Sequence, residues 1–148
     1  MKEKVLLILK RVAFYILSFT WGFIMSFIGL LAIIPLACMK KVRVYHGRLC
    51  AAIGHRWGGV SLGCFFIASV EDIETEHIKA HESGHGIQNI MFGPFFIFLV
   101  SIPSAIRYWY RHIKYTKKGI EPPTAYDDIW FEGMATKLGY NVVAKDVL

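Results

Sequence analysis

His81-Glu82-Ser83-Gly84-His85 is the stretch on which we expect the fold of this 148-residue chain to be centred. Its two histidines stand four positions apart, about one turn of an α-helix, so both imidazoles would project from one face. Such a pair can bind a single zinc ion through nitrogens at about 2.0–2.1 Å. Glu82 follows the first histidine, where its carboxylate can take a proton from a metal-bound water. The spacing therefore predicts a metal site on a helix, in preference to two surface histidines on an amphipathic helix.

A helix over about residues 72–91 would carry this motif. Glu71 and Asp72 place negative charge near its start, where the helix dipole favours it, and apolar residues follow at near-helical spacing. Gly84 and Gly86 weaken such a helix by roughly 1 kcal/mol each relative to alanine. A small residue at Gly84 leaves room beside the metal for a substrate or for a crossing backbone.

The composition predicts an integral membrane protein. Hydrophobic residues make up 55% of the chain and charged residues 19%, which is too apolar for an ordinary soluble domain of this size. Residues 12–39 carry no charge, and about 20 apolar residues span a bilayer as a helix. A secretory signal peptide has an apolar core of only about 7–15 residues. We therefore expect a retained transmembrane helix over residues 12–39.

The net charge of +6 is concentrated in basic clusters beside the apolar runs, as expected of a protein that contacts lipid headgroups. We expect the lipid bilayer as a partner and no nucleic acid, because no basic face on a soluble module is visible. The three cysteines form an odd set without C-x-x-C spacing. They argue against a disulfide framework and against a thiolate metal site.

Two further segments lie around the motif helix. Val42–Tyr45 alternates polar and apolar residues as a strand does, and residues 60–67 predict a second strand, so we expect a small β-hairpin over residues 42–69. A second apolar segment covers about residues 90–106, and its apolar centre of about 17 residues is at the lower limit for a span. Pro94 and Pro103 interrupt it, so it either crosses the membrane or re-enters and turns back. Tyr108-Trp109-Tyr110 then resembles an interfacial anchor.

A catalytic zinc keeps three protein ligands and one open position, so the motif needs a third ligand. We expect Glu132, on a predicted helix over residues 129–138, with Asp127, Asp128 and His112 as weaker candidates. If both apolar runs simply cross, Glu132 and the motif lie on opposite sides of the membrane. Then either the second run is re-entrant, or the site lies at membrane depth, or Glu132 is not a ligand.

Over about residues 58–139 the chain resembles a group of small bacterial membrane proteins with an H-E-x-G-H motif, and more distantly the glutamate-zincin metallopeptidases. The matching elements are Gly59-Val60-Ser61-Leu62-Gly63, the motif with Gln88, Phe92-Gly93-Pro94, Ile102-Pro103-Ser104, and Glu132-x-x-Ala135 with Leu138-Gly139. The resemblance implies zinc-dependent peptide hydrolysis and a bacterial cytoplasmic membrane. It also implies a sheet edge that pairs with an extended substrate, and the alternative is a hairpin that only covers the motif helix. In those peptidases an aspartate four residues past the glutamate often orients a ligand histidine. Here that position is Thr136, which can hydrogen-bond but carries no charge.

These observations predict a mainly α-helical membrane protein, with a small hairpin, forming one metallopeptidase-like domain over residues 1–148. Zinc would be held by His81, His85 and Glu132, with Glu82 as general base on a peptide or protein substrate. Tyr126, His112 or Arg111 would stabilise the oxyanion. The alternative is a catalytically inactive metal-binding membrane protein that acts through protein contacts.

A di-iron oxidase is a third possibility, because Glu74-x-x-His77 precedes Glu82-x-x-His85. It is disfavoured because such pairs must come from different helices to face one another. His77 is expected to face solvent, since about 12 Å of helix separates it from His85.

Overall fold

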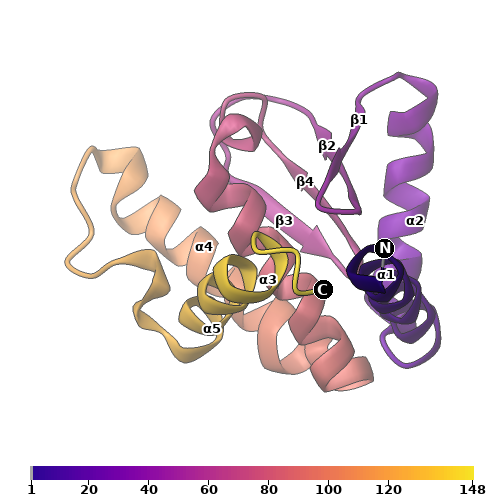
Figure 1. The fold of residues 1–148 in the computed structure, drawn as a ribbon. Helices are drawn as coiled ribbons and strands as arrows, with labels where there is room; N and C mark the ends of the chain where they lie inside the picture. The colour runs from indigo at the N-terminus through magenta and orange to yellow at the C-terminus, as the bar shows by residue number, and fades with distance from the viewer. Residues whose placement is uncertain (1) are drawn as a thin grey trace.

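A four-stranded sheet lies between two pairs of helices in the computed structural model, which describes residues 2–148 (Figure 1). Helices α1 and α2 lie on one side of the sheet, and α3 and α5 lie on the other (Figure 1). The elements are α1 (Lys2–Thr20), α2 (Phe23–Cys38), β1 (Val42–Tyr45), β2 (Arg48–Ala52), β3 (Gly59–Leu62), β4 (Phe65–Ala68), α3 (Glu76–Phe92), α4 (Ile102–Lys114) and α5 (Trp130–Leu138). The prediction of a mainly helical fold is confirmed.

The first apolar stretch is broken near its middle. Helices α1 and α2 meet at an angle of 101°, so the single helix predicted over residues 12–39 is two helices. The Asn89 side-chain amide of α3 donates to the carbonyl of Gly22 at 3.1 Å and to the Ser26 hydroxyl at 3.2 Å. The Gly22 carbonyl also accepts from the Ser26 amide at 3.4 Å, so the buried amide of the motif helix adds a second donor at the bend.

No single helix among residues 2–148 is both long and apolar enough to cross a bilayer. Two bent pairs reach that length and composition together: α1 with α2, and α3 with the chain from Ile97 to Lys118. Large apolar side chains on these segments face outward, for example Leu9 and Leu31 at 59% exposure and Phe98 at 68%. Exposed apolar surface of this extent is typical of proteins that contact lipid or another protein.

The sheet is larger than the predicted hairpin. Its strand order is β1-β2-β4-β3, with β2 and β4 parallel and the outer pairs antiparallel. The strand predicted over residues 60–67 is two strands, because the chain reverses at Gly63, whose φ is +69°. All four residues of β4 are buried, whereas β3 is an edge strand.

The motif helix closely follows its predicted range. A 3₁₀ turn over Asp72–Glu74 precedes α3, and the Thr75 hydroxyl caps α3 by accepting from the Ile78 amide at 3.3 Å. After Phe92 the second apolar segment bends by 118° through a 3₁₀ turn and a π turn, and α4 then leads back. This reversal returns the chain to the motif, so the ligands predicted from both sides of the segment can meet.

Helix α5 crosses α3 at very short range, beside the motif. A Cβ atom added to Gly84 would lie 1.9 Å from the carbonyl oxygen of Ala135, and one added to Gly139 would lie 1.9 Å from that of Ala80. Of the two uses predicted for the space at Gly84, the crossing backbone is the one present. The crossing brings Glu132 next to the two histidines.

Candidate metal centre

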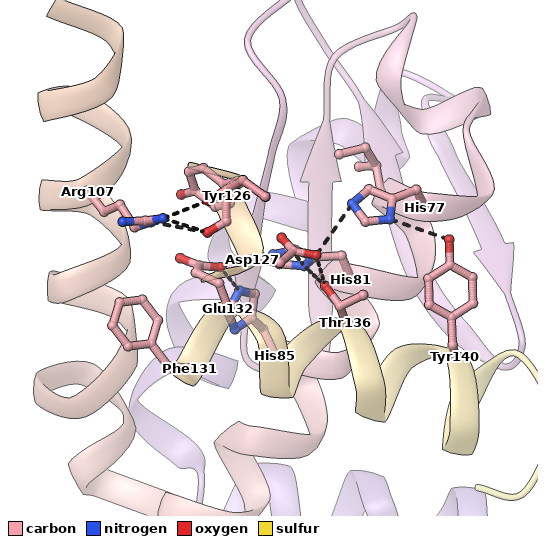
Figure 2. Close-up of polar contacts among 12 residues, drawn as sticks. His77, His81, His85, Arg107, Tyr126, Asp127, Phe131, Glu132, Thr136 and Tyr140 are labelled. Carbon is pink, nitrogen blue, oxygen red and sulfur yellow. Dashed lines mark hydrogen bonds and ion pairs between the residues drawn. The ribbon is translucent and has the colours of Figure 1, made fainter. Parts of the chain in front are cut away.

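Three side chains from α3 and α5 converge in the interior of the protein. The Nε2 atom of His81 lies 3.1 Å from Oε2 of Glu132, and Nε2 of His85 lies 3.2 Å from the same oxygen (Figure 2). Glu132 is fully buried and the two histidines are each 5% exposed. The structure thus brings together the three residues proposed as ligands from the sequence, and they form a group that can hold a metal ion.

The opposite edge of each imidazole is fixed by a hydrogen bond. Gln88, one turn after His85, accepts from Nδ1 of His85 at 2.7 Å, and its own amide donates to the Phe131 carbonyl at 2.8 Å. The Thr136 hydroxyl donates to a carboxylate oxygen of Asp127, so it accepts from Nδ1 of His81 at 2.8 Å. In its neutral form, an imidazole bonded in this way carries its proton on Nδ1 and directs an unprotonated Nε2 towards Glu132.

This arrangement suits a cation. Two Nε2 lone pairs and one carboxylate oxygen converge, and such acceptors repel unless a positive charge lies among them. The donor atoms of a tetrahedral zinc ion stand about 3.3 Å apart, close to the separations seen here. The other oxygen of Glu132, Oε1, is buried without a hydrogen-bond partner. Nitrogen and carboxylate donors are the set found in catalytic zinc sites, so the residues present fit zinc.

The environment of Glu132 favours the charged form of its carboxyl. Burial acts to raise the pKa of Glu132, but hydrogen bonds donated by the imidazoles of His81 and His85 outweigh it when no metal is bound. The pKa of this carboxyl then lies below its usual range. A bound divalent ion would take the place of those donated protons, and a charged carboxylate ligand would help to neutralise it in a buried site.

Glu82 lies beside the group without belonging to it. It is 6% exposed, and burial raises the pKa of its carboxyl, with a further rise from the charge of Glu132 and an opposing effect of the two histidines. Its Oε1 would be 2.7 Å from a Cβ atom on Gly59, so the carboxylate lies against strand β3. A carboxylate whose pKa is raised above its ordinary value accepts a proton more readily, which suits a general base.

A cavity of about 480 Å³ is lined in part by His81, Glu82 and His85, and Glu132 lies behind the two histidines. Most of its lining is apolar. It comes from α2, from β3 with the loop before it, from α3, from the segment that turns back after α3, from α4, and from the loop before α5. Gly59, Val60 and Ser61 of the edge strand β3 form part of the wall. An extended chain in the cavity would lie between this edge and the three converging side chains.

The three residues proposed to stabilise the oxyanion lie in different surroundings. Tyr126 lines the cavity, and its ring centroid lies 6.4 Å from that of His81. Arg111 instead donates to the carbonyl of Thr124 at 2.8 Å, and His112 stacks on Tyr108 at 5.9 Å outside the cavity lining. Only Tyr126 of these three lies beside the centre.

The weaker ligand candidates lie in the loop before α5. Asp128 accepts from the Ala125 amide at 3.0 Å, and Asp127 is bonded to Thr136. Sequence reasoning missed the structural roles of Gln88, Asp127 and Arg107, the last of which holds the loop by donating to the Tyr126 carbonyl at 2.9 Å. The i, i+3 spacing of His85 and Gln88 could have indicated the hydrogen bond between these two side chains.

Comparison with protein-family models, with curated proteins and with solved structures finds no match for this chain.

Proposed function

We propose that this chain is a membrane-embedded zinc metallopeptidase. The observation that carries the proposal is the convergence of His81, His85 and Glu132 beside a cavity whose lining includes the two histidines and Glu82. Zinc bound there would polarise a scissile carbonyl and acidify a water molecule.

Glu82 has the position and environment of a general base. It follows a proposed ligand but points to strand β3, so it can accept a proton from the attacking water and later donate it to the leaving amine. The Tyr126 hydroxyl is proposed to donate to the oxyanion, since Tyr126 lines the cavity and burial raises the pKa of its phenol, which keeps it protonated.

The substrate is proposed to be an extended, apolar stretch of polypeptide. Strand β3 has one unpaired side in the described sheet, and three of its residues line the cavity. An added strand would gain main-chain hydrogen bonds there, and its side chains would meet apolar walls that include Met25, Phe96 and Val100. Such stretches occur in membrane-proximal and unfolded proteins.

The membrane association is supported by the surface of the helices. Outward apolar side chains on α1, α2 and the returning segment are flanked by lysine and arginine, as expected at a lipid headgroup layer. We propose that the bent pairs enter the bilayer and turn back, which keeps every ligand on one side.

The test compares hydrolysis by the detergent-purified wild type with that by Glu82→Gln, on an unfolded or membrane-proximal substrate. Glu82→Gln should keep its zinc and lose about 10²–10⁴-fold in rate, because only the base is removed. Glu121→Gln is the matched control, since Glu121 is exposed in the loop after α4. Equal rates for wild type and Glu82→Gln would contradict the mechanism. Bound zinc without hydrolysis by any variant would favour the inactive metal-binding protein.

A further inference from the structure

A second set of possible ligand atoms lies at the rim of the cavity. His77 stands one helical turn before His81 on α3, and its Nε2 lies 3.9 Å from Oδ2 of Asp127 (Figure 2). Both residues line the cavity, and one possible ligand atom from each of His77, His81 and Asp127 lies within 4.8 Å of the other two. His77 thus faces the rim as well as solvent, because the chain before α5 returns alongside α3.

The geometry of this pair fits an ion better than a direct bond. A separation of 3.9 Å is too long for a hydrogen bond, whereas two ligands of a tetrahedral zinc ion stand about 3.3 Å apart. Small rotations of the two side chains would shorten the distance from 3.9 Å to about 3.3 Å. The His77 side chain is 52% exposed, so it has room to rotate. The other ring nitrogen of His77 faces the Tyr140 hydroxyl at 3.4 Å, which directs Nε2 towards Asp127.

The two sets use opposite edges of the same imidazole. Nε2 of His81 faces Glu132, whereas Nδ1 faces Thr136 and lies 3.9 Å from Oδ1 of Asp127. Nδ1 of His81 already donates to Thr136, so an ion at the rim would have two protein ligands and fill its remaining positions with water. Fewer ligands and greater exposure make this the weaker of the two sites.

We propose that His77 and Asp127 form a second, weaker site for a divalent transition-metal ion such as zinc, and that its occupation inhibits the enzyme. The Asp127 carboxylate accepts from the Thr136 hydroxyl, which in turn orients His81. An ion bound to this carboxylate would weaken its hydrogen bond with Thr136 and so disturb the orientation of His81. The ion also narrows the entrance to the cavity. The inhibition rests on the proposed peptidase function, whereas the binding site does not.

The experiment titrates zinc into metal-free, detergent-purified protein against a chromophoric chelator. The wild type should bind about two zinc ions in two affinity classes, and His77→Gln should bind about one, with the tighter class unchanged. His55→Gln is the matched control, because the His55 side chain is 75% exposed and is paired with Glu71 away from the cavity. Hydrolysis by the wild type should fall as zinc fills the weaker class, and hydrolysis by His77→Gln should not.

Three results would overturn the second site. They are a single affinity class of bound zinc in the wild type, a weaker class that is still present in His77→Gln, and a weaker class that is absent from His55→Gln. Asp127→Asn provides an independent check, because it should also lose the weaker class. If no variant hydrolyses the substrate, the peptidase proposal fails, while the two classes of bound zinc still decide the second site.

Discussion

Nδ1 of His81 lies 2.8 Å from the hydroxyl oxygen of Thr136, although the two residues are 55 positions apart in the chain. The same hydroxyl donates to Asp127, so a negative charge acts on the histidine through one intervening oxygen. Thr136 stands where the glutamate-zincin peptidases, which the motif resembles, often carry an aspartate. In this chain a carboxylate, that of Asp127, is present nine residues earlier. A hydroxyl and a carboxylate together can orient a ligand histidine as one aspartate does.

We expect Thr136→Val to weaken zinc binding by about 10–100-fold, because it removes the hydroxyl and keeps the shape. Thr136→Ser keeps the hydroxyl and should bind zinc nearly as wild type does. Competition with a chromophoric chelator measures both. The combination of Thr136→Asp with Asp127→Asn should restore affinity relative to Thr136→Val, since it places the carboxylate directly beside His81. Equal affinities for Thr136→Val and Thr136→Ser would show that the hydroxyl does not orient the ligand.

Zinc should stabilise the fold, because the proposed ligands come from two helices that meet only in the folded chain. With free zinc at about 100 times its Kd, the free energy of unfolding should rise by about 2.7 kcal/mol. Thermal unfolding with zinc and with a chelator measures the difference. His85→Ala and Glu132→Gln should show a smaller shift or none. A wild-type midpoint that does not respond to zinc would argue against this centre.

Gly84→Ala should destabilise the protein and weaken zinc binding. Alanine in place of glycine inside a helix normally gains about 1 kcal/mol, so a loss of stability would have the opposite sign to the intrinsic effect. The reason is the carbonyl oxygen of Ala135, which lies 1.9 Å from the added Cβ atom and forces α5 and Glu132 away. Denaturant unfolding and zinc affinity are the measurements. A more stable variant with unchanged affinity would contradict the close crossing.

Positions 70 and 125 should lie on the same side of the membrane, because the second apolar segment turns back. Both residues are exposed, so single cysteines at these positions can be labelled in otherwise cysteine-free variants. An impermeant maleimide applied to intact vesicles of one orientation should label both or neither. Labelling of one alone would mean that the segment crosses.

Only one of the three cysteines should react with N-ethylmaleimide at pH 8 in the folded protein. Burial raises the pKa of the Cys50 thiol to about 11, and it does the same to Cys64, whereas Cys38 is exposed. About one thiol in a thousand is ionised three pH units below its pKa, and the thiolate is the reactive form. Cys38→Ser should abolish the labelling of the folded protein. Unfolding in denaturant should make the remaining thiols react.

The parts of the fold that follow from local pattern could be predicted from the sequence. The spacing of His81 and His85 indicated the motif helix, and the helix that carries Glu132 begins within one residue of its predicted start. The bend at Gly22 could not be predicted, because a contact with Asn89, 67 positions away, stabilises it. The role of Asp127 could not be predicted either, because only the fold brings its carboxylate to Thr136.

The bond from Asn89 to Gly22 also couples the motif helix to the N-terminal pair of helices. Asn89 lies one turn after His85, so the helix that carries the motif is completed by a carbonyl from the N-terminal pair of helices. If that pair inserts into the bilayer first, the motif helix can dock only afterwards. If the proposed peptidase function holds, a newly made chain would then stay inactive until it is inserted, and premature cleavage of other proteins during synthesis would be avoided without a separate inhibitor.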